Sequence, residues 1–161
     1  MENLDELIED YGNIYDVIFW EYRDKREEGL ELLYQKGDNS DIYYHYIEAL
    51  SHYEIGQDKL DENNYEDALK HFLFVTERLP FYCDAYNNLG VVYAGLHQYD
   101  EAEKSFKKAI ELTKEDYARA NYYLNLSCLY ADMGNEEEAK KCSEIAYKLA
   151  PDLKDNSEEK N

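Results

Sequence analysis

The strongest constraint on the fold of this chain is a set of small residues that recurs at a nearly constant spacing. In the stretch 83–119, Gly90 and Ala102 lie in two short segments of helical periodicity that a turn separates. The same two columns hold small residues 34 positions earlier and 37 positions later: Gly56 with Ala68, and Ser127 with Ala139. Glycine within a helix costs about 1 kcal/mol relative to alanine. We therefore expect these columns to mark close helix crossings, where a missing Cβ lets two backbones approach.

Larger residues follow the same spacing. The middle stretch holds Leu89, Tyr93 and Phe106, and the outer two units close at Pro80 and Pro151. Four positions carry residues that depart from the pattern: His52, Lys59, Lys114 and Ser143. The sequence thus predicts three consecutive helix–turn–helix units.

This pattern resembles the tetratricopeptide repeat (TPR), a helix–turn–helix unit of 34 residues with the pattern W-x2-L-G-x2-Y, then A-x3-F, then P. The resemblance covers roughly two thirds of the chain. It implies an all-α fold, an α-solenoid of three TPR repeats over 49–82, 83–119 and 120–153. One long helix is expected to begin near Ser40 and to lead directly into the first repeat.

The two ends do not match the repeat. We expect residues 1–48 to form N-terminal capping helices, because one hairpin cannot bury its apolar side alone. The alternative is that this segment, with Trp20, forms a dimer contact or part of a partner site. The segment 154–161 is polar and is expected to be a disordered tail. The last helix is expected to cap the stack itself through one narrow stripe: Ala139, Cys142, Ala146 and Leu149.

The expected turns carry residues that favour helix ends. Gly95 and Gly134 follow first helices, where a left-handed residue is tolerated best as glycine. Asn135 followed by Glu138 predicts a capping box, and Asn64 begins a weaker example of the same signal. These signals place the turns between the two helices of each unit.

The composition excludes several classes of partner. The net charge is −20 and the pI is about 4.4, which argues against nucleic acid and against anionic membrane surfaces. No apolar run is long enough to span a bilayer, and the acidic start differs from a secretory signal. The three cysteines form neither a disulfide framework nor a zinc motif, and we expect them to be small core residues in a reducing compartment: Cys83, Cys128 and Cys142. These features predict a cytoplasmic protein.

The sequence predicts no enzyme activity, no cofactor and no metal site. None of the four histidines has a Cys or Glu partner at metal-binding spacing, and His52 is interpreted as a packed core histidine. Neither a nucleophile elbow nor a phosphate-binding or dinucleotide-binding loop occurs.

Stacked repeats curve, and their first helices line the concave face on which partners bind. The residues of these helices that lie off the predicted core stripe form the candidate groove: Tyr53, Gln57, Asp84, Asn87, Asn88, Val91, Asn121, Tyr122, Asn125 and Cys128. Amide side chains both donate and accept hydrogen bonds, and tyrosine adds contact area at low entropic cost. These residue types suit an extended peptide, although a merely solvated face is the alternative.

The resemblance also allows one subclass of TPR protein to be tested. TPR co-chaperones hold the acidic C-terminal tails of heat-shock chaperones with a clamp of Lys, Asn and Arg side chains. Only Asn88 fits this clamp among the matching positions, which hold uncharged residues: Tyr53, Gln57, Asn88, Asn121 and Asn125. A carboxylate would lack its cationic partners. We therefore expect a neutral or basic peptide.

The leading hypothesis is a non-enzymatic protein–protein interaction module that binds a peptide or protein segment in this groove, as an adaptor, scaffold or chaperone. Two alternatives stay open. The chain resembles the small acidic chaperones of type III secretion translocators in layout, size and acidity. It could instead be a self-assembling structural protein, a homodimer joined through its N-terminal helices.

Overall fold

The computed structural model describes residues 40–154, together with residues 17, 28–29, 31 and 34. Over 40–154 the described chain forms six helices: α4 (Ser40–Asp61), α5 (Tyr65–Arg78), α6 (Cys83–Gly95), α7 (Tyr99–Leu112), α8 (Asp116–Asp132) and α9 (Glu136–Leu149). The long helix expected from about Ser40 is confirmed as α4, which has 22 residues. The expectations for capping helices within 1–48, for a dimer contact at Trp20 and for a disordered tail fall mostly outside the described residues.

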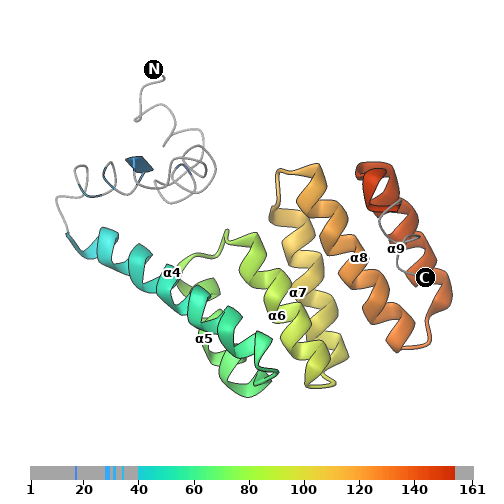
Figure 1. The fold of residues 1–161 in the computed structure, drawn as a ribbon, viewed down its shortest axis with the longest axis horizontal. Helices are drawn as coiled ribbons and strands as arrows, with labels where there is room; N and C mark the ends of the chain where they lie inside the picture. The colour runs from blue at the N-terminus through green and yellow to red at the C-terminus, as the bar shows by residue number, and fades with distance from the viewer. Residues whose placement is uncertain (1–16, 18–27, 30, 32–33, 35–39, 155–161) are drawn as a thin grey trace.

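The helices form three antiparallel hairpins, α4–α5, α6–α7 and α8–α9, which stand side by side along the long axis of the molecule (Figure 1). Each hairpin packs on the next, because α5 contacts α6 and α7 contacts α8. The predicted all-α solenoid is therefore confirmed. The exact boundaries of the repeats stay a prediction.

The second helices are amphipathic, and each buries one narrow stripe. In α5 the stripe contains Ala68, Phe72 and Val75, and in α7 it contains Ala102, Phe106 and Ala109. Residues three and four positions apart lie on one helix face, so each stripe points into the stack. In the terminal helix α9 the buried residues are all small: Ala139, Cys142 and Ala146. This agrees with the expected narrow stripe of a helix that ends the stack.

The small residues of the first helices make room for an aromatic ring. A Cβ built on Gly90 would lie 2.5 Å from the Phe106 ring, and one on Gly56 would lie 2.9 Å from the Phe72 ring. The predicted close approach is thus present, with a correction: a ring, rather than the facing backbone, occupies the space of the missing Cβ. The third hairpin has no such ring, and there Ser127 donates a 2.7 Å hydrogen bond to the carbonyl oxygen of Ala139.

Each of the three turns within the hairpins contains one residue in the left-handed conformation. Asn63, His97 and Gly134 have φ values of 57°, 59° and 77° at equivalent positions, so the prediction for Gly134 is confirmed. The prediction for Gly95 is wrong, because Gly95 is the last residue of α6 and His97 takes the left-handed position. Gly95 is needed instead for space, since a Cβ there would lie 2.6 Å from the ring of Tyr65.

Of the two predicted helix N-caps, the one expected to be weaker is formed and the one expected to be stronger is not. Asn64 caps α5, and its side-chain oxygen accepts a 3.4 Å hydrogen bond from the backbone N–H of Asp67. Asn135 precedes α9 but makes no side-chain cap hydrogen bond, so the capping box with Glu138 is not formed. Three consecutive glutamates begin α9, and their charge favours the positive end of the helix dipole without a cap.

We predict that Gly90→Ala destabilises the fold even though alanine is the better helix former. The added Cβ collides with the Phe106 ring, and overpacking of this kind costs about 1–3 kcal/mol. Urea unfolding followed by circular dichroism at 222 nm measures the change. Gly56→Ala, with its ring farther away, should cost less. A Gly90→Ala variant as stable as the wild type would contradict the role assigned to this contact.

Candidate partner-binding groove

The first helices of successive hairpins lie next to one another. Helix α4 contacts α6, and α6 contacts α8. Within the described part of the chain, α5, α7 and α9 make no comparably close approach to each other. The first helices therefore form the inner side of the curved stack, and the candidate groove residues lie on these helices.

Tyr53 joins the first two hairpins at this inner side. Its hydroxyl oxygen accepts a 3.2 Å hydrogen bond from Nδ2 of Asn88 on α6 and a 3.4 Å bond from Nε2 of Gln57 on α4. Burial raises the pKa of Tyr53, and the nearby Asp84 carboxylate raises it further. Three of the predicted groove residues thus form one connected cluster, with Asp84 close to it.

Tyr122 corrects the prediction that its side chain lies off the core stripe. It is 4% exposed and belongs to the core between the hairpins. Its hydroxyl donates to the Asp84 carboxylate and lies 3.5 Å from Sγ of Cys83. Burial and the Asp84 charge raise the pKa of Tyr122, which stays a protonated donor. The ring of Tyr122 is therefore buried and unavailable to a partner, and its hydroxyl stabilises the Asp84 carboxylate through a hydrogen bond.

A second amide link joins α6 to α8. Nδ2 of Asn125 donates a 2.8 Å hydrogen bond to Oδ1 of Asn87. Asn121 is not part of this link, because its Nδ2 donates to the Tyr117 carbonyl oxygen one turn earlier in α8. Among the predicted groove amides, Asn125 with Asn87 and Asn88 with Tyr53 thus link neighbouring hairpins, whereas Gln57 and Asn121 bond within their own helices.

A cavity of about 190 Å³ lies between α6 and α8, with Phe106 of α7 at its floor. Its lining combines apolar and polar residues: Val91, Ala94, Phe106, Asn125, Cys128, Leu129 and Asp132. Cys128 is exposed, which corrects the core position expected of all three cysteines but agrees with its placement off the predicted core stripe, whereas Cys83 and Cys142 are buried as predicted. The sequence did not single out Ala94 or Asp132, although they follow Val91 and Asn125 at helical spacings of three and seven residues.

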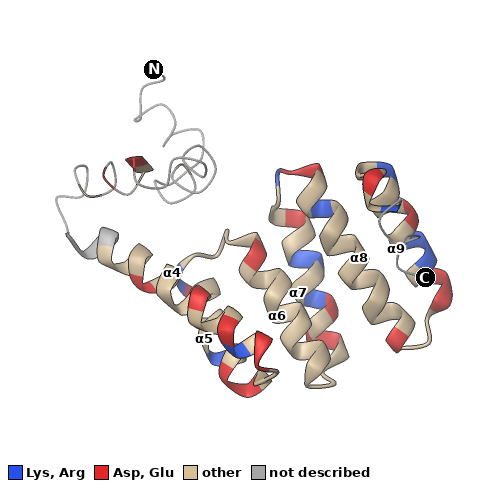
Figure 2. Cartoon of the chain, in the orientation of Figure 1, with Lys and Arg blue, Asp and Glu red and all other residues tan. Residues whose placement is uncertain are grey.

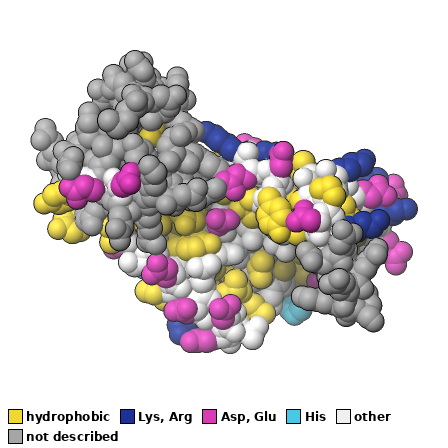
Figure 3. All heavy atoms as spheres, turned by 45° about the horizontal axis from the view of Figure 1, so that its top comes forward, with side chains coloured by type: hydrophobic (Ala, Val, Ile, Leu, Met, Phe, Trp, Pro, Cys, Tyr) yellow, Lys and Arg dark blue, Asp and Glu magenta, His cyan; other side chains and the backbone are white. Residues whose placement is uncertain are grey.

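Charge is distributed unevenly between the two sets of helices. The first helices α4, α6 and α8 together hold eight acidic and two basic residues, whereas the second helices hold eleven acidic and eight basic residues. The middle of α6 and α8 is free of charged residues (Figure 2). In the space-filling view, hydrophobic and acidic side chains lie side by side on the visible face (Figure 3).

Most lysines of the second helices pair locally. All three lysines of α7 and Lys141 of α9 make ion pairs three or four residues away in their own helix, as Lys104 does with Glu101 and Lys141 does with Glu137 and Glu138. Such pairs offset the positive charge of α7 and part of that of α9. The acidic excess of the first helices has few such partners within the described residues.

No group of three or more His, Cys, Asp or Glu side chains within the described residues is arranged to hold a metal ion. None of the described helices is long and apolar enough to cross a membrane.

The stacked hairpins with glycine–ring joints define a helix–turn–helix repeat protein of the α-solenoid class. The family model of the tetratricopeptide repeat matches residues 81–152. Residues 81–152 are therefore TPR repeats, and TPR repeats form protein–protein interaction modules with an extended concave surface.

Curated relatives match the chain over a short part of their length. The human and mouse proteins named protein O-mannosyl-transferase TMTC3 are each 33% identical over 112 residues, which is 62% of this chain. The match covers 12% of the length of each relative. The transferase activity in that name is therefore a property of the relative and is not carried to this chain.

Solved structures of TPR proteins share the fold. The N-terminal domain of stress-induced protein-1 (STI-1) from C. elegans is 18% identical with a TM-score of 0.59, covering 69% of this chain and 92% of that domain. A crystal structure of MamA is also 18% identical, with a TM-score of 0.60, covering 94% of this chain and 87% of that one. MamA from Desulfovibrio magneticus RS-1 gives 0.60 at 18% identity, covering 88% and 74%. At these identities the likeness concerns the fold alone.

We predict that Tyr122→Phe lowers the free energy of unfolding by about 1.5–3 kcal/mol. The change removes a donor to a partly buried carboxylate and leaves Asp84 without that partner. Urea unfolding at pH 7 measures the loss. Tyr117→Phe, at a side chain of α8 that is 53% exposed, is the matched control and should be close to neutral. Equal stability of the two variants would contradict the assigned role of Tyr122.

The raised pKa of Tyr122 predicts a loss of stability in alkaline solution. The unfolded tyrosine ionises near pH 10, whereas the folded one keeps its proton, so the stabilisation present below pH 10 falls as the pH rises. Between pH 9 and pH 11 the stability difference between wild type and Tyr122→Phe should shrink by about 1.4 kcal/mol. Urea unfolding at both values checks this, and an unchanged difference would contradict it.

Proposed function

We propose that this chain binds an extended segment of a partner protein along the inner side formed by α4, α6 and α8. The observation that carries the proposal is the cavity between α6 and α8, because it joins apolar walls to an exposed carboxylate at the side where partners of TPR proteins bind. A cavity of this size suits one apolar side chain of the partner. Asp132 lies beside it and suits a neighbouring cation.

The chemistry of the groove favours a neutral or basic segment over an acidic one. The first helices carry an acidic excess, which attracts a basic partner and speeds its association. The amide nitrogens of Asn88 and Asn125 are engaged within the protein, which leaves their side-chain oxygens to accept from N–H groups of a partner. Both features disfavour the carboxylate tails that a cationic clamp would hold.

The adaptor, scaffold or chaperone role rests on this same groove. The free thiol of Cys128 is consistent with the reducing, cytoplasmic compartment that the sequence favours. The resemblance to type III secretion chaperones and the self-assembly hypothesis depend on residues 1–48, and the described groove favours neither of them over a general interaction module.

We predict that a photo-crosslinker attached to Cys128 captures the partner. Cys83 and Cys142 are 3% and 7% exposed, so a maleimide reagent reacts selectively at Cys128. The labelled protein is incubated with native cell extract and irradiated, and mass spectrometry identifies the adducts. The same reagent at Ile145→Cys in a Cys128→Ser background is the control, because Ile145 is exposed on α9. We expect the partner adduct from position 128 and its absence from position 145.

Charge reversal tests the preference for a basic segment. Asp132→Lys, introduced into the Cys128-labelled protein, should reduce the adduct several-fold, whereas Glu144→Lys on α9 should leave it unchanged. Adducts of equal yield from positions 128 and 145 would overturn the groove proposal. Adducts that contain only a second copy of this chain would support self-assembly instead.

A further inference from the structure

Two histidines from different helices meet outside the groove. Nδ1 of His52 on α4 and Nδ1 of His71 on α5 are 2.9 Å apart, and their ring centroids are 4.9 Å apart. Both side chains are partly exposed. His52 adjoins the groove residue Tyr53 in sequence, but successive helical residues point about 100° apart, so His52 faces α5 whereas Tyr53 bonds toward α6.

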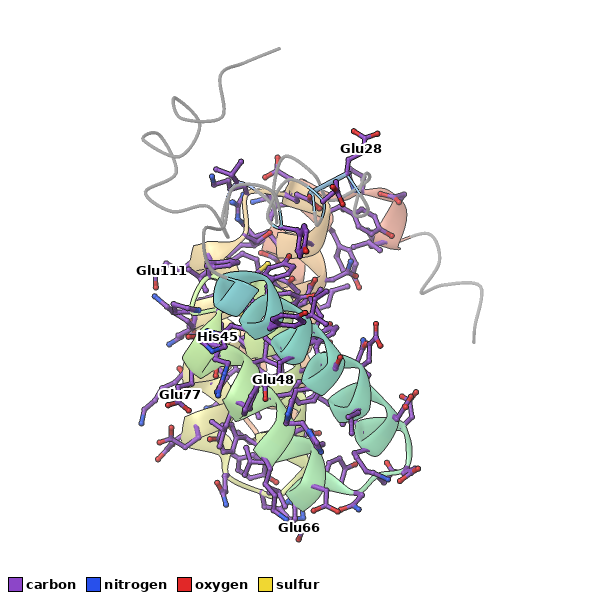
Figure 4. All side chains as sticks on the ribbon, turned by 90° about the vertical axis from the view of Figure 1, so that its left-hand side faces the viewer. Glu28, His45, Glu48, Glu66, Glu77 and Glu111 are labelled. Carbon is purple, nitrogen blue, oxygen red and sulfur yellow. The ribbon has the colours of Figure 1, made fainter. Side chains whose placement is uncertain are left out.

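The His52 ring is held in place by neighbouring groups. It stacks on the ring of Phe74 with centroids 3.7 Å apart and planes 12° apart. The guanidinium carbon of Arg78 lies 3.6 Å from the centroid of Phe74, and Nε of Arg78 is 3.7 Å from the Glu48 carboxylate. Figure 4 looks onto this α4–α5 end of the stack, with Glu48 labelled. The packing fixes one imidazole before any ligand arrives.

This pair is specific to the first hairpin. The equivalent positions of the next hairpin hold Tyr86 and Ser105, and those of the third hold Tyr123 and Cys142. The fold therefore does not require two facing imidazoles at this place. The interpretation of His52 as a simple packed histidine misses its partner, because the spacing of 19 residues between the two histidines spans a helix–turn–helix.

We propose that His52 and His71 form a two-imidazole site for a divalent transition-metal ion that favours square-planar or tetragonal coordination. Cu²⁺ is the ion that we expect this site to bind most tightly. Two nitrogens at cis positions of such an ion, with bonds of about 2.0–2.1 Å, lie about 2.9 Å apart, whereas a tetrahedral ion separates them by about 3.4 Å. The observed separation of 2.9 Å is that of the hydrogen bond between the two rings, and it already equals the separation of cis ligands in the first geometry. Cu²⁺ also binds nitrogen ligands more tightly than Ni²⁺ or Zn²⁺.

The protonation of the pair suits this chemistry. In the absence of metal, one Nδ1 carries the proton and the other accepts it. Metal binding moves that proton to Nε2 of the same ring, which leaves both Nδ1 lone pairs for the ion. Neutral imidazole is the form that binds metal.

The remaining coordination positions belong to water or to an outside ligand. The described residues supply no third His, Cys, Asp or Glu donor at this place. A site with two protein donors is open and exchangeable, in contrast to a closed structural zinc site with four. A metal ion bound to both histidines would link α4 to α5 and stabilise the first hairpin.

The test is titration of the full chain with Cu²⁺ alone, followed by electron paramagnetic resonance and by thermal unfolding. We expect one tightly bound ion per chain, hyperfine structure from two equatorial imidazole nitrogens, and a melting temperature that rises with Cu²⁺ concentration. His71→Gln and His52→Gln should each weaken binding by at least about tenfold, since loss of even an outer-shell partner costs that much. Zn²⁺ should bind more weakly than Cu²⁺.

Two histidine variants outside the site are the controls. His45→Gln changes an exposed histidine two turns earlier in α4, and His97→Asn keeps a residue type that tolerates the left-handed conformation at that turn. Both should bind Cu²⁺ as the wild type does. Circular dichroism verifies folding, and His71→Gln serves as the test if His52→Gln loses its stacking and unfolds. Wild-type affinity in His71→Gln, a one-nitrogen spectrum, or tighter binding of Zn²⁺ would overturn the proposal.

Discussion

The contact between a helix glycine and the ring of the following helix is the joint on which this stack depends. Gly90 leaves a space that the Phe106 ring fills, and Gly56 does the same for Phe72. The ring belongs to the buried stripe of the second helix, so its position sets how closely the two helices of a hairpin approach. Because each hairpin then packs on the next, the distance between the two helices of one hairpin also affects where the next hairpin lies.

The polar groups of the inner side follow from that arrangement. Once the first helices lie next to one another, short side chains on α6 and α8 reach each other, as in the bond between Asn125 and Asn87. Tyr122 is long enough to remain in the core while its hydroxyl reaches Asp84. These bonds join neighbouring hairpins at the inner side, and the cavity beside Cys128 lies between the two helices, α6 and α8, that one of them links.

The sequence predicts the fold well because its signals are local and repeated. The columns of Gly90 and Ala102 carry information about packing inside one hairpin, and three copies reinforce it. The site is predicted less well, because helical spacing places a residue on a face without saying how deep it lies. Tyr122 and Cys128 show this limit, since the sequence predicts a position on the groove face of α8 for both, yet Tyr122 is buried and Cys128 is exposed. The meeting of His52 with His71 depends on the register of two helices, which no single column reveals.

Departures from the repeat pattern follow from the position of a hairpin in the stack. Leu89 and Leu126 occupy one column in the second and third hairpins and are each 3% exposed, whereas Ile55 in the same column of the first hairpin is 41% exposed. In the second and third hairpins this column packs on the hairpin before it, as Leu89 does with Phe72 and Leu126 does with Phe106. Ile55 has no such contact with a preceding hairpin among the described residues, so the packing constraint on its column is weaker. His52 and Lys59 replace aromatic residues on this same helix α4, and the facing imidazoles accordingly lie in the first hairpin, where the repeat pattern is followed least strictly.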